Sequence, residues 1–129
     1  MNLRIDWNET YSIGIPELDA QHQLLFNIAN SIPETVDEKK ARTCIVRLFK
    51  YAREHFTAEE DEMRRVGYPK LDEHIRIHDA LISNLSDVAM APLDTEEANI
   101  AFKKFALHWI VDHIMIRDKD IARHIAQQR

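Results

Sequence analysis

The sequence predicts an all-α protein: an up-down-up-down antiparallel four-helix bundle with an irregular N-terminal arm and a short C-terminal helix. Three observations support this prediction. The 129 residues include only two glycines and four prolines, far too few turn residues for an all-β sandwich. Four long segments repeat apolar residues at steps of three and four, which is the spacing of one helix face. The connections between these segments are short, so consecutive helices have to lie antiparallel.

The chain is expected to begin with an arm and a first helix. Residues 1–18 are predicted to be irregular because Gly14 and Pro16 disfavour a helix there. The arm carries enough apolar side chains to pack on another part of the molecule, namely Trp7, Tyr11, Ile13, Ile15 and Leu18. The first helix is expected over about 19–32, where Pro33 ends it. Its apolar face contains Leu18, His22, Leu25, Ala29 and Ile32.

The second helix is expected over about 38–66 and the third over about 70–90. Gly67 suits the left-handed position that follows a helix and Pro69 lies just beyond it, so the second helix has a strong stop signal. The core-facing residues of the second helix are Ile45, Leu48, Ala52, His55, Glu59 and Met63. Those of the third helix are Leu71, His74, His78, Leu81, Leu85 and Val88.

The fourth helix is expected over about 95–116, and a short tail helix over about 119–127. Asp94, followed three residues later by Glu97, has the pattern of a capping box at the start of the fourth helix. The core face of that helix contains Phe102, Ala106, Trp109 and His113. The whole chain, residues 1–129, is interpreted as one domain.

Composition narrows the class of protein further. Hydrophobic residues make up 45% of the chain and charged residues 30%, as in ordinary soluble globular proteins. A net charge of −5, with no basic arm or zinc finger, argues against a nucleic-acid partner. Cys44 is the single cysteine, which excludes an intrachain disulfide. Because no signal-like N-terminus or membrane-spanning apolar run occurs, we expect a cytoplasmic protein without a membrane span. We also expect a monomer.

The predicted core faces carry polar residues that a core normally excludes. These are His22 on the first face, His55 and Glu59 on the second, His74 and His78 on the third, and His113 on the fourth. A lone histidine on an apolar face is more often a satisfied core residue than a ligand. Five of them with a carboxylate are different, because each unpartnered buried polar group costs several kcal/mol. A shared metal ion is the simplest partner for all of them.

Spacing supports the metal interpretation. His55 and Glu59 lie four residues apart, as do His74 and His78, so each pair projects from one helix face about a turn apart. Asp118 is a seventh candidate, but it follows His113 by five residues and would lie ~140° away on a straight α-helix. The sequence therefore predicts that the helix ends or bulges between residues 114 and 117.

The remaining histidines and the other polar residues of note are expected to have ordinary roles. His108 precedes His113 by five residues and is expected to point away from the ligand face. His124 is expected to be solvated in the tail, and Cys44 to be a small packing residue. Beyond Glu59, the acidic run at 60–62 is expected to form a solvated helix face.

These residues together resemble the hemerythrins, specifically the bacterial single-domain kind. The resemblance is carried by Trp7 and Ile13-Gly14-Ile15 in the arm, LDAQHQLLF at 18–26, HFTAEE at 55–60, GYP at 67–69, HIRIH at 74–78 and WIVDHI at 109–114 with Asp118-Lys119. It covers nearly the whole chain. All seven candidate ligands occur in order at the local spacings of that family.

The resemblance implies a centre of two non-haem iron ions joined by an oxo or hydroxo group. One iron would take His74, His78 and His113, the other His22 and His55, and Glu59 and Asp118 would bridge them. Two roughly octahedral irons have about twelve coordination positions, of which these ligands and the bridging oxygen fill all but one. The open position lies on the iron with two histidines, where a small molecule can bind end-on.

The expected function is reversible O2 binding for storage, buffering or delivery to an O2-consuming enzyme, and the protein itself is not expected to be an enzyme. The imidazole-rich ligand set favours this function, since carboxylate-rich sets better support oxidising iron. An apolar O2 pocket is expected from Leu25, Phe56, Trp109, Ile110 and Ile114, which could equally be plain core residues. Most relatives are expected to have leucine at the position of Ile110, whose β-branched side chain is stiffer at χ1.

Three alternatives stay open. One is a di-iron oxidase, peroxidase or NO-handling protein, which would turn over peroxide or a reductant. Another is a sensor of O2 or NO, which would need a separate partner because this chain has no fused output domain. The last is a bundle that zinc stabilises at the same site, since metal binding is coupled to folding.

Overall fold

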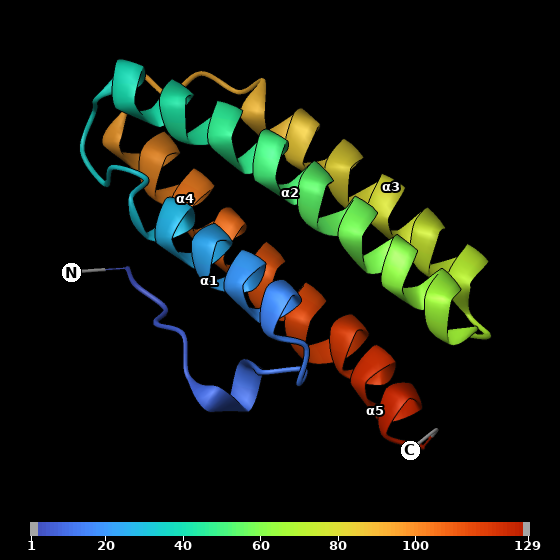
Figure 1. Cartoon of the computed structure of the whole chain (residues 1–129). Helices are drawn as coiled ribbons and strands as arrows, with labels where there is room; N and C mark the ends of the chain where they lie inside the picture. Colours follow the sequence, from blue (N-terminus) through green and yellow to red (C-terminus); the bar gives the residue numbers. More distant parts are fainter. Residues whose placement is uncertain (1–2, 128–129) are drawn as a thin grey trace.

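A computed structural model describes residues 3–127 of the chain, without the side chains at 114 and 115. It is an antiparallel four-helix bundle with no strand among the described residues, which confirms the predicted fold (Figure 1). The long helices are α1 (Pro16–Asn30), α2 (Glu38–Val66), α3 (Leu71–Ala89) and α4 (Glu96–Asp112). A 3-10 turn, η1 (Glu9–Tyr11), lies in the arm, and the chain ends in η2 (His113–Asp118) and α5 (Lys119–Gln127).

The helix ends follow from local sequence chemistry. Gly67 ends α2 in the left-handed conformation, with φ of 66°, as its position after the last apolar residue predicts. The N-cap of α4 differs from the prediction. Thr95, not Asp94, is the capping residue, and its hydroxyl accepts a hydrogen bond from the backbone N–H of Ala98.

The first helix begins at Pro16, three residues earlier than predicted. Proline fits there because the first helical position needs no N–H donor and its fixed φ suits a helix. The arm before it is held against α1 at two points. Asn30 exchanges two hydrogen bonds with the backbone of Ile5, and Asp19 accepts hydrogen bonds from Ser12 and Ile13. This attachment places the aromatic residues of the arm over α1.

The apolar core fills the bundle at the end where α1 meets α2 and α3 meets α4. Its central side chains have 0% exposure: Ala29, Leu48, Ala52, Leu85 and Ala106. Two buried polar residues at this end were not predicted. The Asn99 amide donates to the carbonyl oxygens of Leu93 and Thr95, and the Lys103 ammonium lies 3.1 Å from a carboxylate oxygen of Glu34. They hold the loops that close this end.

The last helix does not stop between its two predicted segments. α4 continues through η2 into α5, and η2 is a π-helix from His113 to Asp118. Of the two predicted alternatives between residues 114 and 117, an end or a bulge, the structure thus shows the bulge, and the predicted tail helix extends the same rod. No helix of the described residues is long and apolar enough to cross a membrane.

Candidate metal centre

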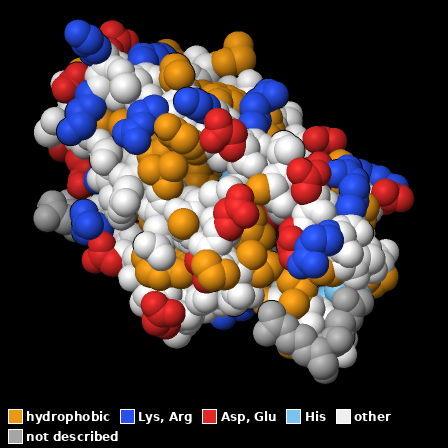
Figure 2. Space-filling model, in the orientation of Figure 1, with side chains coloured by type: hydrophobic (Ala, Val, Ile, Leu, Met, Phe, Trp, Pro, Cys, Tyr) orange, Lys and Arg blue, Asp and Glu red, His pale blue; other side chains and the backbone are white. Residues whose placement is uncertain are grey.

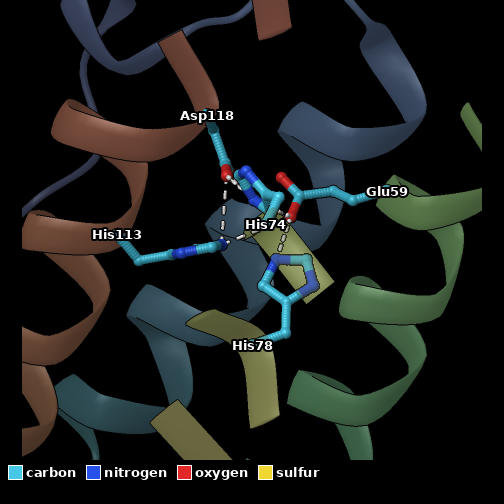
Figure 3. Close-up of side chains that lie close together, drawn as sticks. All are labelled: Glu59, His74, His78, His113 and Asp118. Atoms are coloured by element: carbon cyan, nitrogen blue, oxygen red, sulfur yellow. Dashed lines mark hydrogen bonds and ion pairs between the residues drawn. The ribbon is translucent and has the colours of Figure 1, made fainter. Parts of the chain in front are cut away.

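The polar residues of the four core faces meet in one layer of the bundle. Each of the seven is at most 5% exposed: His22, His55, Glu59, His74, His78, His113 and Asp118. They come from α1, α2, α3 and the π-helix that follows α4. Figure 3 shows five of them, with three imidazole rings around the carboxylates of Glu59 and Asp118. The structure thus brings together every residue that the sequence marks as a candidate ligand.

The seven residues form two overlapping groups, each of a kind that can hold a metal ion. One group contains Glu59, His74, His78, His113 and Asp118, and the other contains His22, His55, Glu59 and Asp118. Within each group, one nitrogen or oxygen from every residue lies within 4.8 Å of all the others. We call the first the three-histidine half and the second the two-histidine half. The two halves share both carboxylates.

Glu59 divides its two oxygens between the halves. Its Oε1 lies 3.0 Å from Nε2 of His78 and 3.3 Å from Nε2 of His113. Its Oε2 lies 3.4 Å from Nε2 of His55, which comes four residues earlier on the same helix. The carboxylate therefore stands between the two groups with one oxygen facing each.

Asp118 divides its oxygens in the same way. Its Oδ2 lies 2.7 Å from Nε2 of His22, and its Oδ1 lies 3.1 Å from Nε2 of His113. The π-helix makes this possible, because its wider turn joins residues five apart and so brings Asp118 back to the side of His113. On a regular α-helix this carboxylate would point away from the centre.

The arrangement fits a pair of cations. Several buried atoms that could bind a metal have no hydrogen-bond partner among the described residues, including Nε2 of His74, Nε2 of His78, Oε2 of Glu59 and Oδ1 of Asp118. An ion bound at roughly 2.1 Å separates neighbouring ligand atoms by about 3 Å, close to the spacing seen here. A cation in each half would satisfy the atoms that the protein alone leaves without a hydrogen bond.

The electrostatics of the protein alone point the same way. Burial lowers the pKa of His55 and His113, but the adjacent carboxylates outweigh it and raise the pKa of His55 to about 9 and that of His113 to about 10. Burial also raises the pKa of Glu59 and Asp118, yet the surrounding histidines bring both below their ordinary values. Imidazolium protons thus neutralise two buried carboxylates, which is the role that a bound cation fills.

His74 behaves differently from its neighbours. Burial and the adjacent His78 lower its pKa to about 4, so the ring is neutral near pH 7. A neutral imidazole with an unpaired Nε2 is already in the form that binds a metal.

Two side chains that the sequence pattern does not single out support the histidines from outside the centre. Nδ1 of His78 lies 2.8 Å from the carboxylate of Glu60, and Nδ1 of His55 lies 2.9 Å from the amide oxygen of Gln21. The prediction that Glu60 belongs to a solvated face is therefore wrong. Such partners fix the ring and its tautomer, leaving Nε2 free for a metal.

Aromatic rings close the centre on both sides. The Phe56 ring stacks on that of His78 at 3.9 Å, with an angle of 8° between the planes. In the arm, the Trp7 ring lies 6.4 Å from that of His22 and 6.3 Å from that of Phe26. Of the arm residues that were expected to pack on another part of the molecule, Trp7 thus lies against the two-histidine half.

Four of the five residues predicted to line an O2 pocket are buried in one apolar cluster, namely Leu25, Phe56, Trp109 and Ile110. The side chain of the fifth, Ile114, lies outside the described part of the chain. The indole N–H of Trp109 donates to the carbonyl oxygen of Leu81, which fixes its ring between α3 and α4.

The residues set aside by the sequence analysis have mixed outcomes. His108 is exposed and Cys44 is buried, as expected. His124 is not simply solvated, because its ring packs edge-on against Tyr68 at 5.4 Å and its Nε2 lies 3.2 Å from the carbonyl oxygen of Val66. These contacts attach α5 to the end of α2.

Five imidazoles and two shared carboxylates, buried between four antiparallel helices, define a metal-binding helical-bundle protein. The sequence profile of the hemerythrin HHE cation-binding domain matches residues 13–125. The chain therefore belongs to the hemerythrin family.

Named relatives agree with this assignment. The bacteriohemerythrin of Clostridium acetobutylicum is 30% identical over 123 residues, covering 88% of this chain and 95% of the relative. The myohemerythrin of Theromyzon tessulatum is 34% identical over 108 residues, covering 84% and 82%. The fold also matches a crystal structure of a leucine-to-phenylalanine mutant with a TM-score of 0.77, at 23% identity over 98% of this chain and 99% of that one.

Proposed function

We propose that this protein binds O2 reversibly at a non-haem di-iron centre with a bridging oxo or hydroxo group. The observation that carries the proposal is the unequal pair of halves. The three-histidine half offers five protein donor atoms, and the two-histidine half offers four. With one bridging oxygen added to each, the first iron reaches six ligands and the second reaches five. One position for a small molecule is left, on the iron held by His22 and His55.

The ligand chemistry favours binding over oxidation. Two ferrous ions held by these residues would supply electrons to O2 as it attaches and would take the same electrons back on its release. Neutral imidazoles from five histidines favour the ferrous state, whereas oxidases of the ferritin type use glutamates from every helix. Lys103 is the one further buried charged side chain among the described residues, and it pairs with Glu34 at the other end. No additional buried acid is therefore at hand to cleave a bound oxygen species.

The chain supports this role by excluding water. Leu25, Phe56, Trp109 and Ile110 form an apolar wall, and Trp7 covers His22 from the arm. Water and anions promote the loss of O2 as a reduced product, so an apolar surround slows oxidation of the iron.

We also propose that the protein is a cytoplasmic monomer, not an enzyme, and that it serves an O2-consuming enzyme. The lone Cys44 is consistent with a reducing compartment.

An optical titration tests the proposal. Protein loaded with ferrous iron without air is exposed to O2 and then deoxygenated, while near-UV and visible charge-transfer bands are recorded. Bands that appear with O2 and vanish on its removal are expected. Bands that appear and persist would instead favour an oxidase, peroxidase or sensor. Zinc-loaded protein is the control, since it gives no such bands. If the iron-loaded protein also fails to respond to O2, and the two forms are equally stable, a structural metal would be favoured.

A further inference from the structure

The first half of α2 carries a concentration of positive charge. Residues 39–53 contain six Lys and Arg and no Asp or Glu. The rest of the chain has eleven Lys and Arg against twenty-two Asp and Glu, so an acidic molecule has one strongly basic segment. Figure 2 shows Lys and Arg side chains gathered over this part of α2, around a patch of apolar atoms.

The charges form one surface. Five exposed residues follow each other along α2 at steps of three or four, so they lie along one side of the helix: Lys39, Arg42, Val46, Lys50 and Arg53. We call these five residues the α2 stripe. Val46 at its centre is 67% exposed. The Arg42 guanidinium donates to the carbonyl oxygens of Ala89 and Ala91, which brings the 80% exposed Met90 beside the stripe.

The stripe ends at a hollow next to the metal centre. This hollow, about 300 Å³ in volume, is lined by Arg53, Phe56, Thr57, Glu60, His78, Asp79 and Ile82. Arg53 is the last cation of the stripe. Phe56 stacks on His78, whose Nε2 lies 3.0 Å from Glu59 inside the centre. A ring of the three-histidine half, that of His78, thus lines the hollow itself.

We propose that the α2 stripe is the docking surface for an acidic one-electron carrier protein that returns oxidised iron to the ferrous state. The inference rests on the proposed function, because an O2-binding protein whose iron slowly oxidises needs a reductant. In each encounter the donor loses one electron and one ferric ion becomes ferrous, so two donor molecules are oxidised per iron pair. Covalent bonds of either protein are neither made nor broken.

The position of the stripe selects this partner over others. Electron transfer needs the two redox centres close together, and the stripe leads to the place where a metal ligand lies just beneath the surface. Delivery of O2, which diffuses freely, needs no such alignment. An anionic membrane or nucleic acid would meet strong repulsion from the remaining surface, whereas a small acidic protein can cover the stripe alone. Transient redox complexes typically bury small areas, which suits a surface of this size.

Stopped-flow reduction tests the proposal. Oxidised iron-loaded protein is mixed with a reduced acidic [2Fe–2S] ferredoxin at several salt concentrations. The triple variant Lys39→Glu, Lys50→Glu, Arg53→Glu is compared with Lys70→Glu, Lys104→Glu, Arg123→Glu, which makes the same charge change at exposed sites elsewhere. The stripe variant is expected to react roughly 10–100-fold more slowly at low salt, with little salt dependence, and the control triple variant less than about 3-fold more slowly.

Further measurements separate the possible outcomes. Both variants are expected to bind O2 and to react with dithionite like the unmodified protein. Binding of the iron-loaded protein to immobilised oxidised ferredoxin, a readout without turnover, is expected to weaken for the stripe variant alone. If the unmodified protein binds ferredoxin through the stripe but does not bind O2 reversibly, the docking surface stands and the proposed O2-binding function fails.

Three results would overturn the docking proposal. One is equal reduction rates for the two triple variants. Another is a salt-sensitive dimer in sedimentation of the protein alone that the stripe variant abolishes, which would assign the surface to a second copy of this chain. The third is tighter binding to phosphatidylserine vesicles or to duplex DNA than to the ferredoxin.

Discussion

The two halves of the metal centre share their carboxylates but differ in almost everything around them. The three-histidine half lies next to a surface hollow, and His78 is one of the residues that line it. The two-histidine half lies beneath the N-terminal arm, with Trp7 against His22. The half with five protein ligands is close to solvent, and the half with four is covered. If the proposed function holds, the position open to a small ligand would lie in the covered half.

The outer partners of the histidines differ in the same sense. A carboxylate, Glu60, accepts from His78, while a neutral amide, Gln21, accepts from His55. A carboxylate partner makes the imidazole a stronger donor to its metal. We infer that one half holds its ion firmly, and that the other keeps a more weakly supported ion available to a ligand.

The largest effect is expected where the two halves are joined. Glu59→Ala removes an oxygen from both groups, so the protein is expected to lose both irons, whereas His22→Ala removes a ligand of the two-histidine half only and is expected to retain about one iron per chain. His113→Ala is also expected to abolish loading of the pair. Iron content after desalting, measured by atomic absorption, gives the comparison.

His108→Ala is the matched control for these variants, since His108 is exposed and on the same helix as the site. It is expected to retain both irons. Iron loss in this variant, or full loading in Glu59→Ala, would show that the ligand set is wrong.

The next effect is a dependence of stability on pH that the metal should remove. In the metal-free protein the pKa of His55 is raised to about 9 and that of His113 to about 10. A raised folded-state pKa contributes stability that is fully present below about pH 6.5 and lost as pH rises through the folded-state pKa. The free energy of unfolding is thus expected to fall between pH 7 and 10, on the order of 1 kcal/mol per pH unit.

Urea unfolding at pH 7, 8, 9 and 10 measures this fall. With metal bound, the cations neutralise Glu59 and Asp118 in place of the protons, so a much flatter profile is expected. The double variant Glu59→Gln, Asp118→Asn should flatten the profile of the metal-free protein as well. An equally steep profile in that variant would mean that other groups cause the dependence.

The metal-ligand candidates and their outer partners also differ in how well the sequence predicts them. The inner residues lie on regular helix faces, so periodicity alone aligns His22, His55 and His74 toward one core. Asp118 breaks that periodicity, and the break predicts that the helix ends or bulges there, which the structure shows as a π-helix. Binding of iron by these residues stays a prediction.

The outer residues could not be predicted because their partners lie on other helices. Gln21 precedes His22 and Glu60 follows Glu59, so each points about 100° from its neighbour, toward an adjacent helix. Which residue it meets there depends on the rotation and offset of the packed helices. The same reason applies to Lys103, which reaches Glu34 in the α1–α2 loop, and to His124, which packs on Tyr68.

A smaller effect is expected when the outer partners are exchanged. Glu60→Gln removes the carboxylate behind His78, and Gln21→Glu places one behind His55. The first variant is expected to lose iron to a chelator roughly 10-fold faster than the unmodified protein, and the second to retain iron longer in the two-histidine half. Release of iron to ferrozine under anaerobic conditions gives both rates. Identical kinetics for the two variants would show that the charge of the outer partner does not distinguish the halves.

The smallest effect concerns the apolar wall. Ile110 is 2% exposed and belongs to the same buried cluster as Phe56 and Trp109. Ile110→Ala opens space beside the centre that water can enter, so autoxidation is expected to speed up a few-fold, followed as decay of the bands of the O2 form. Leu48→Ala removes a fully buried side chain from the same cluster two turns before His55, and both substitutions should cost about 2–5 kcal/mol of stability. Faster autoxidation in Ile110→Ala alone would place Ile110 in the wall, because general loosening of the bundle would affect both variants alike.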